Sequence, residues 1–277
     1  MAKGKRLIEK YKSLIDLFVI IVDARVPFSS IHNSFTEGLI DKNKSFLVFS
    51  KTDLADDSQT KKWIDYYNKK FNKVIECNLT DNNATTKNLG KEIDLYFKKN
   101  NIKRKQIMVL GVPNVGKSTM INSLAGRKVA KTGNKPSITR GVTWISTKSG
   151  FRIFDTPGIL EPKIDSNRSA YNLAIVNSIK NDILNRDDIV EHLLTFLGNN
   201  YPKETLEFIS ETDDSILDDY IKIEESIMKK KNFVLKNNEP DYERLFIYIL
   251  KSVSTGKFGK ITFDNYEQFR KRPLNKK

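Results

Sequence analysis

A glycine-rich stretch that ends in lysine and serine is the strongest chemical signal in this sequence. Residues 111–118 read G-V-P-N-V-G-K-S and follow the apolar run 107–110. Polyphosphate oxygens need several converging backbone N–H groups, glycines that let the backbone approach, and a helix N-terminus behind them. The pattern therefore predicts a phosphate-binding loop between a strand and a helix, with a chance match in a lysine-rich chain as the alternative. The residues expected to contact the nucleotide here are Asn114, Val115, Gly116, Lys117, Ser118 and Thr119.

Three residues of this region are expected to act on the phosphates and on Mg²⁺. The Lys117 ammonium would reach the β- and γ-phosphates, and the Ser118 hydroxyl would ligate Mg²⁺. Thr139 lies in the Gly- and Pro-punctuated segment 136–141 and is our candidate for a second hydroxyl ligand, because such a loop can order around Mg²⁺ and γ-phosphate. A surface loop threonine is the alternative interpretation of Thr139.

A second motif with a carboxylate follows another apolar run. Residues 155–158 read D-T-P-G directly after residues 151–154. This places Asp155 at the C-terminal end of a strand and gives Gly158 an N–H that can face a γ-phosphate. We expect Asp155 to hold Mg²⁺ through a water molecule, and we expect Lys117, Thr139 and Gly158 to form the catalytic set.

A base-reading motif lies upstream of the phosphate loop. Ser50, Lys51 and Asp53 follow the apolar run 46–49. The guanine N1–H and N2–H₂ groups are donors, so a site for this base needs a carboxylate acceptor, and a lysine stem can lie along the ring. We assign the guanine edge to Asp53, with Ser50 and Lys51 beside it. A further short strand ends at Cys77 and Asn78, whose backbone is expected near the guanine O6.

The order of these motifs resembles that of the circularly permuted GTPases. The base-reading motif comes first, followed by the phosphate loop, the segment 136–141 and D-T-P-G. Residues 23–27, D-A-R-V-P, and residues 254–262 near the end resemble the ribosome biogenesis GTPase A (YlqF-like) family. The resemblance covers essentially the whole chain. It implies a cytoplasmic protein that binds GTP and GDP, hydrolyses GTP, and acts on the large (50S) ribosomal subunit and its rRNA.

Departures from the usual GTPase pattern bear on affinity and on rate. Ser50 stands where an asparagine ordinarily braces the loop, so we expect guanine specificity to persist through Asp53 with weaker affinity. Ile159 stands where many GTPases carry the glutamine that orients water, a replacement that the family shares, so slow intrinsic hydrolysis is expected. The aromatic-Pro-Gly-His segment that opens the family's chains is not found before Met1. Resemblance also implies a K⁺ ion at Asn114, where it offsets developing charge.

Two function classes therefore stay open. The first is a Mg²⁺-dependent GTPase that the ribosome stimulates, which Lys117, Ser118, Thr139 and Gly158 favour. The second is a GTP-binding, rRNA-associated placeholder with little or no hydrolysis, which Ile159 and the unobserved histidine segment favour. A small-molecule kinase is a weaker third hypothesis, because no acceptor site is recognisable.

Charge is spread unevenly along the chain. The sequence holds 48 Lys and Arg against 34 Asp and Glu, a net charge of +14. Residues 1–162 hold 29 basic and 15 acidic residues, whereas residues 163–277 hold 19 of each. A basic surface suits a polyanionic partner such as RNA, although scattered lysines often only solvate a surface. The basic residues that we expect nearest to RNA phosphates are Lys3, Lys5, Arg6, Lys10, Lys12, Lys103, Arg104, Lys105, Lys257, Lys260, Arg270, Lys271 and Arg272.

Apolar periodicity predicts the elements that position these residues. Strands are expected over 17–22, 46–49, 74–77, 107–110 and 151–154, and helices over 5–13, 60–68 and 87–98. This alternation predicts an α/β fold: a circularly permuted P-loop GTPase domain, with a mostly parallel doubly wound sheet, over residues 1–163. Nucleotide would bind at the carboxyl ends of the strands.

Helical spacing replaces this alternation in the remainder of the chain. It predicts a small all-helical domain over residues 164–277 that binds RNA or the ribosome. Asp187 and Asp188 are expected to cap a helix that Gly198 closes, and Tyr242 is expected to begin an inward-facing apolar stripe.

Composition adds three expectations. The single cysteine, Cys77, excludes an intramolecular disulfide and suits a reducing compartment. The longest apolar run, 17–22, is too short to cross a bilayer, so no membrane partner is expected. We expect a monomer in the cytoplasm.

Overall fold

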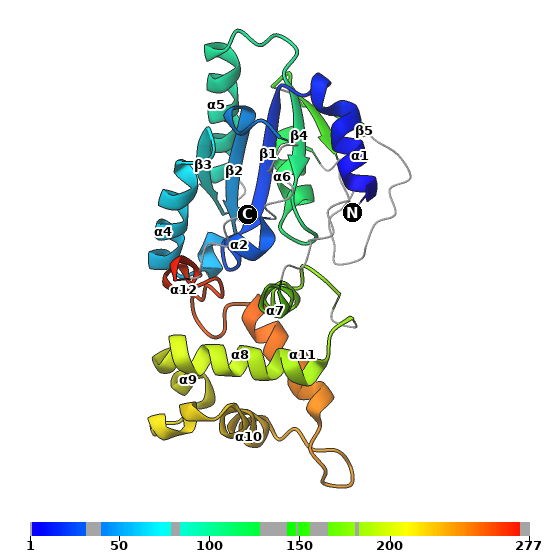
Figure 1. The fold of residues 1–277 in the computed structure, drawn as a ribbon. Helices are drawn as coiled ribbons and strands as arrows, with labels where there is room; N and C mark the ends of the chain where they lie inside the picture. Colours follow the sequence, from blue (N-terminus) through cyan, green and yellow to red (C-terminus); the bar gives the residue numbers. More distant parts are fainter. Residues whose placement is uncertain are drawn as a thin grey trace. The chain divides into compact units, whose positions relative to one another are not determined.

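The computed structural model describes residues 2–31, 40–78, 84–127, 143–147, 149–155, 166–180 and 183–271 (Figure 1). The chain forms two compact units. The first joins residues 1–163 to the segment 264–277, and the second comprises residues 164–263. The second unit therefore differs from the expected domain 164–277, because the chain returns to the first unit at Asp264.

A six-stranded sheet forms the centre of the first unit, in the order β3-β2-β1-β4-β6-β5. Neighbouring strands are parallel except β5, which runs antiparallel to β6. The strands are β1 Leu17–Asp23, β2 Ser45–Ser50, β3 Lys73–Cys77, β4 Gln106–Leu110, β5 Thr143–Ser146 and β6 Arg152–Asp155. Five of them coincide with the predicted apolar runs, whereas β5 was not predicted.

Helices cover both faces of this sheet. On one face, alternate residues of β1 such as Val22 share a core with Trp63 of α4. On the other face, Phe46 of β2 meets Tyr96 of α5 edge-on, with ring centroids 5.4 Å apart. The principal helices are α1 Ala2–Tyr11, α4 Asp57–Asn68, α5 Ala84–Lys99 and α6 Lys117–Ala125. Burial of successive strand residues under two helical layers confirms the predicted doubly wound α/β fold.

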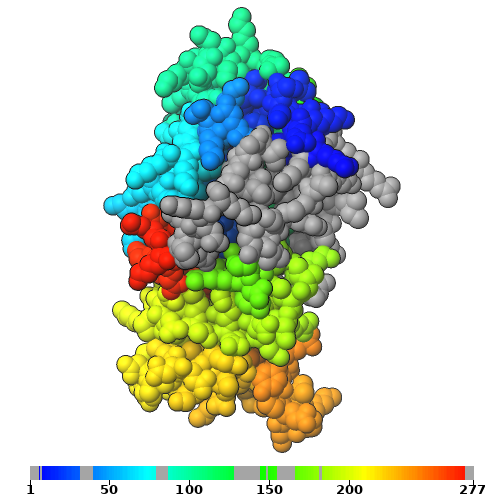
Figure 2. Space-filling view, in the orientation of Figure 1, coloured from blue at the N-terminus to red at the C-terminus, as the bar shows by residue number. Residues whose placement is uncertain are grey.

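The returning segment packs on α4 within the first unit. It contains α12, Tyr266–Arg270, which lies against α4 (Figure 2). The Asp264 carboxylate accepts hydrogen bonds from the Ser29 backbone N–H at 2.7 Å and from Ser29 Oγ at 2.8 Å. The Asp264 carbonyl accepts from Trp63 Nε1 at 2.7 Å, and the Phe269 ring lies 4.9 Å from the Trp63 ring. These contacts explain why the last segment belongs to the first unit.

The second unit is helical, as predicted, but several local features differ. Helix α8 is capped by the Asn185 side chain, which accepts from the Asp187 N–H, so Asp187 is not the cap. The helix also continues past Gly198. A Cβ at Gly198 would lie 2.8 Å from the Leu217 carbonyl oxygen, so this glycine permits close packing and does not end the helix. Tyr242 is exposed. The helices are α7 Asn167–Ile175, α8 Arg186–Asn200, α9 Pro202–Ile209, α10 Tyr220–Lys231 and α11 Tyr242–Ser254.

Apolar side chains at helical spacing form the core of this unit. Ile223 and Ile227 of α10 are buried, as are Leu245 and Ile249 of α11. These stripes match the predicted inward faces. Among the residues that the structure describes, each helix is too short or too polar to cross a membrane.

Candidate nucleotide-binding site

The carboxyl ends of adjacent parallel strands bring the predicted nucleotide-binding segments to one edge of the sheet (Figure 1). Ser50 at the end of β2 lies level with Asp23 of β1 and with Cys77 of β3. Strand β4, which leads into the phosphate loop, pairs with the other side of β1. The base-reading motif and the phosphate loop therefore flank the end of β1, where a doubly wound sheet binds its ligand.

Glycines shape the phosphate loop between β4 and α6. A Cβ at Gly111 would lie 2.6 Å from the Ile21 carbonyl oxygen of β1, so only glycine lets the loop leave the sheet here. Gly116 has φ +100° and immediately precedes α6, whose first residue is Lys117. Asn114 also adopts a left-handed conformation, with φ +60°, and it is exposed. The loop thus leads into a helix N-terminus, which is the arrangement that binds phosphate.

Lys117 folds back over the loop. Its Nζ donates to the Gly111 carbonyl at 2.6 Å and to the Val112 carbonyl at 2.8 Å. Ser118 and Thr119 follow in the first turn of α6 and are half-buried, like Lys117. The ammonium and the hydroxyl groups are therefore at the N-terminal end of one helix, as the sequence predicts for a site that holds a polyphosphate.

Ser50 connects the base-reading motif to the phosphate loop. Its Oγ lies 2.7 Å from the Val115 carbonyl oxygen and 2.9 Å from the Val22 carbonyl oxygen, and the side chain is fully buried. One hydroxyl proton serves both acceptors. Ser50 thus braces the phosphate loop. The asparagine that usually stands at this position has the same bracing role, and a short side chain with one donor is enough for it.

Lys51 and Asp53 lie next to this brace. Lys51 has a left-handed backbone, with φ +57°, and its Nζ donates to Asp23 Oδ2 at 2.9 Å. Asp53 follows in a short 3₁₀ turn, Thr52–Leu54, and its side chain is exposed. An exposed carboxylate can accept from the donor edge of a guanine, and this role of Asp53 stays a prediction.

A buried ion network at the end of β1 was not predicted. The Asp23 carboxylate accepts from Arg25 Nε at 3.0 Å and from an Arg25 terminal nitrogen at 2.8 Å, in addition to Lys51. Asp23 is fully buried and Arg25 nearly so. The D-A-R motif was the available signal, but the sequence alone gave it no role. Through Asp23, this motif positions Lys51 of the base-reading motif.

Opposing effects set the protonation of this network. Burial by itself raises the pKa of Asp23, but the charges of Arg25 and Lys51 and their hydrogen bonds together hold that pKa below its ordinary value. Burial likewise lowers the pKa of Arg25, and the Asp23 carboxylate more than compensates, with a smaller contribution from Asp53. The Asp23 carboxylate and the Arg25 guanidinium therefore stay charged near neutral pH.

Cys77 and Asn78 end the neighbouring strand β3. Cys77 is buried, and burial raises the pKa of its thiol to about 11. The thiol is therefore protonated near neutral pH and is no nucleophile. The groups left to contact a base here are the backbone of Cys77, which lies level with Ser50, and the half-buried Asn78 that follows it.

The structure places only part of the proposed magnesium set. Ser118 lies in the first turn of α6, and the backbone of Asp155 pairs with Val109 of β4, close to the start of the phosphate loop. Thr139, Gly158 and the Asp155 side chain lie outside the described residues, as does Ile159. A hydroxyl at a helix N-terminus beside a strand that ends in aspartate fits Mg²⁺, because this ion takes most of its ligands from nucleotide phosphates and water.

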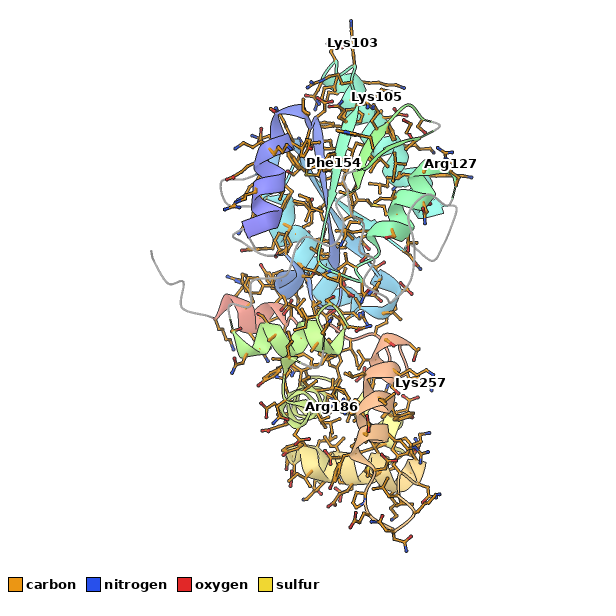
Figure 3. All side chains as sticks on the ribbon, turned by 90° about the vertical axis from the view of Figure 1, so that its right-hand side faces the viewer. Lys103, Lys105, Arg127, Phe154, Arg186 and Lys257 are labelled. Atoms are coloured by element: carbon orange, nitrogen blue, oxygen red, sulfur yellow. The ribbon has the colours of Figure 1, made fainter. Side chains whose placement is uncertain are left out.

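The basic cluster 103–105 lies at the opposite end of the sheet from this site. It immediately precedes β4, whereas the phosphate loop follows that strand (Figure 3). Arg104 lies 3.2 Å from Asp16, and Lys105 lies 3.3 Å from Asp94. Two of the three cations are thus already paired with carboxylates, which reduces what they offer to RNA phosphates.

Two protein-family models match the chain. One, described as 50S ribosome-binding GTPase, matches residues 106–236, and the other, described as RsgA GTPase, matches residues 11–165. Their overlap includes the phosphate loop and the segment up to D-T-P-G.

Curated relatives and solved structures match over nearly the full length. The ribosome biogenesis GTPase A of Bacillus cereus is 34% identical over 277 residues, covering 97% of this chain and 93% of the relative. The protein of the same name from Thermotoga maritima is 29% identical over 266 residues, covering 96% and 92%. The crystal structure of GNP-bound YlqF from T. maritima matches with a TM-score of 0.64 and 27% identity, over 95% of this chain and 98% of that chain.

Proposed function

Because this chain belongs to the ribosome biogenesis GTPase A family, whose members are circularly permuted GTPases, we propose that it is an assembly factor for the large (50S) ribosomal subunit. It binds guanine nucleotides and hydrolyses GTP to GDP and phosphate. We further propose that it acts as a monomer in the cytoplasm, contacts rRNA through the helical domain, and is stimulated by the ribosome. The structural observation that supports the proposal is the hydrogen bond from the Ser50 hydroxyl to the Val115 carbonyl, because it connects the base-reading motif to the phosphate loop.

In the proposed mechanism, binding of GTP redirects groups that are already in place. Lys117 exchanges its two loop carbonyls for the β- and γ-phosphates, and the amides of residues 114–119 hold the phosphate oxygens. Asp53 accepts from the guanine edge while Asp23 keeps Lys51 beside it. Ser50 transmits the position of one motif to the other because it contacts both.

Catalysis is assigned to Lys117, Thr139 and Gly158. Mg²⁺, which GTPases of this class generally use, would be held by Ser118 and Thr139 directly and by Asp155 through water, and it would neutralise charge on the phosphates. Since Ile159 cannot orient water, we propose that intrinsic turnover is slow and that a group supplied by the ribosome accelerates it, an effect that can reach about 10³ to 10⁵-fold in other GTPases.

Asn114 is the proposed K⁺ ligand. Its left-handed backbone holds it exposed in the phosphate loop, where a monovalent cation would offset charge that develops during hydrolysis. Turnover in K⁺ is expected to exceed turnover in Na⁺ at equal ionic strength, and an Asn114→Ala variant is expected to lose that difference. Equal rates of the unsubstituted protein in the two salts contradict the proposal.

The proposed switch couples nucleotide state to ribosome binding. GTP would order the Thr139 and Gly158 segments and favour the ribosome-bound state, and hydrolysis would favour release. The decisive measurement is GTP turnover by the purified chain, alone and with purified large subunits, in matched K⁺ and Na⁺ buffers. Strong stimulation is the expected result. Binding to subunits without stimulated turnover overturns it and favours the placeholder hypothesis.

A further inference from the structure

A cavity of about 440 Å³ opens on the helical unit, and its lining contains none of the residues assigned to GTP. Its walls come from α9, α10, α11 and the segment that follows α11. The residues that matter for its chemistry are Glu204, Glu207, Phe208, Lys231, Tyr248 and Lys257. The volume falls within the roughly 300–1,000 Å³ typical of small-ligand sites, and it suits one nucleotide unit.

Aromatic rings form one wall of this cavity. Phe208 and Tyr248 are half-buried, with ring centroids 5.9 Å apart. Phe208 stacks on the buried Phe258 at 3.7 Å, and Tyr248 meets Phe233 edge-on at 5.4 Å. Both rings therefore pack against buried phenylalanines, and part of each side chain stays accessible. A fixed, partly exposed ring is the kind of surface on which an unpaired base stacks.

Two ammonium groups gather at the Tyr248 ring. Lys231 Nζ lies 5.2 Å and Lys257 Nζ 5.7 Å from its centroid. Lys257 is exposed and lies just beyond the end of α11 (Figure 3). Like charges held at one ring repel each other, and an anion placed between them relieves that repulsion. A third lysine, Lys230, donates instead to the Phe208 carbonyl and to Ser210 Oγ, and so helps to fix the wall.

Two carboxylates line the same cavity without forming ion pairs with these lysines. Within the continuously described segment 183–271, neither Glu204 nor Glu207 forms an ion pair with Lys231 or Lys257. The cavity therefore offers cationic donors, aromatic faces and anionic acceptors at once. A ligand that matches all three carries a phosphate, a planar ring and an N–H₂ group. A nucleotide with an exocyclic amino group has this combination.

We propose that this cavity binds one unpaired nucleotide of a ribosomal RNA strand. The base stacks on Tyr248 and Phe208, its amino group donates to Glu204 or Glu207, and the phosphate lies between Lys231 and Lys257. In a duplex the base would be stacked and paired and would not fit into a concave site, so the ligand is single-stranded. This inference rests on the proposed function for its choice of RNA, and it adds the site and the class of nucleotide.

The test compares oligocytidine with oligouridine of about ten nucleotides, bound to the full chain and followed by fluorescence anisotropy. Cytosine carries an exocyclic amino group where uracil carries an oxygen, so the unsubstituted protein should prefer oligocytidine. A Glu204→Gln/Glu207→Gln variant should lose that preference without weakening the binding of oligouridine. Equal binding of the two RNAs by the unsubstituted protein overturns the assignment of the carboxylates.

The lysines and the ring are tested with matched variants. Lys231→Gln/Lys257→Gln should weaken the binding of both RNAs at least about fivefold. It should also reduce the magnitude of the slope of log K against log salt concentration by about 1 per lysine. Tyr248→Leu should weaken them roughly tenfold. The control, Lys222→Gln/Lys251→Gln, removes the same charge from exposed positions of α10 and α11 and should change binding less than about twofold. Equal losses in the lysine pair and in the control pair overturn the site.

Failure of this site and failure of the proposed function give different results. Variants are first checked for unchanged circular dichroism and unchanged intrinsic GTP turnover, since the cavity contains no residue assigned to GTP. If the unsubstituted chain sediments with large subunits but the cavity variants bind oligocytidine normally, the site is wrong and the assembly function stands. If the chain does not associate with large subunits while the cavity variants lose oligocytidine, the site stands and the proposed function fails.

Discussion

Two buried carboxylates of the first unit, Asp23 and Asp264, are stabilised in opposite ways. Asp23 is fully buried and lies between the cations of Arg25 and Lys51. Asp264 is 7% exposed and is held by the backbone N–H and the hydroxyl of Ser29. Both carboxylates involve one short stretch, 23–30: Asp23 begins it, and Ser29 within it donates to Asp264. Ser30 Oγ closes the turn of this stretch by donating to the Val26 carbonyl at 2.6 Å.

The difference follows from what each carboxylate connects. Asp23 holds Lys51, which we propose lies beside the nucleotide, so cations are part of this connection. Burying the Asp23 carboxylate requires such opposite charge around it. The described hydrogen bonds by which the Asp264 carboxylate fixes the returning chain on the first unit come from uncharged groups, the backbone N–H and the hydroxyl of Ser29. The charged connection is therefore expected to be the more costly to break and the more sensitive to acid.

Substitution of Asp23 should have the largest effect. Asp23→Ala leaves the Arg25 guanidinium buried without its carboxylate, which we expect to lower the free energy of unfolding by about 3–5 kcal/mol. Equilibrium urea denaturation measures this. The matched control is Asp53→Ala, which removes an exposed carboxylate of the same site. It should keep the stability and lose guanine selectivity. A small stability change in Asp23→Ala would show that the network is not what holds this region.

Acid should act chiefly through Asp23. Its folded pKa is held below the ordinary value of 3.8, so the stability it contributes is complete above that value and is lost as pH falls toward the folded pKa. The stability difference between the unsubstituted protein and Asp23→Asn should therefore be constant from about pH 7 to pH 5 and should shrink below about pH 4. Urea denaturation at each pH measures this difference. A gap that stays constant down to pH 3 contradicts the assigned charge state.

Breaking the uncharged connection should cost less. Asp264→Ala removes the acceptor of the buried Ser29 N–H and hydroxyl, which we expect to cost about 1–3 kcal/mol in the free energy of unfolding. Glu267→Ala serves as its control. Glu267 lies in the same returning segment as Asp264 and forms an exposed ion pair with Lys62 of α4, so its loss should change the free energy of unfolding by less than about 1 kcal/mol. If Asp264→Ala costs as much as Asp23→Ala, the distinction between the two connections fails.

The parts of the fold that were predictable are those with a local signal. The strands that end at Ser50, Cys77 and Asp155 were predictable because each is a short apolar run followed by a motif or a polar turn. Their parallel direction was predictable because helical stretches lie between apolar runs. Strand β5 carried no such signal, because Thr143–Ser146 is short and pairs antiparallel at the sheet edge. Gly198 was misjudged because a glycine for close packing and a glycine for a helix end are identical in sequence.

The site was predictable where chemistry fixes spacing and not where tertiary structure joins distant residues. The predicted phosphate loop is continuous in sequence, so the position of Lys117 and Ser118 at the start of α6 could be predicted from the motif alone. The ion pair of Lys51 with Asp23 and the anchoring of Asp264 by Ser29 join residues far apart in the chain. Whether an aspartate is buried and paired cannot be predicted from the sequence, because its donors come from distant positions that only the folded structure brings together.

The smallest effect is expected at Ser50, the uncharged connection inside the nucleotide site. Ser50→Ala removes a hydroxyl that lies within hydrogen-bonding distance of the Val22 and Val115 carbonyls, so the free energy of unfolding should fall by about 0.5–1.5 kcal/mol. Affinity for a fluorescent GDP should fall by less than about tenfold, because Asp53 and Lys117, which we assign to the base and the phosphates, are unchanged. Ser58→Ala, at an exposed position in the first turn of α4, should leave the affinity unchanged and alter the stability less than Ser50→Ala. Because the hydroxyl spans two motifs, stability and affinity should fall together in Ser50→Ala. A loss of stability with unchanged affinity would mean that the brace supports the sheet without positioning the phosphate loop.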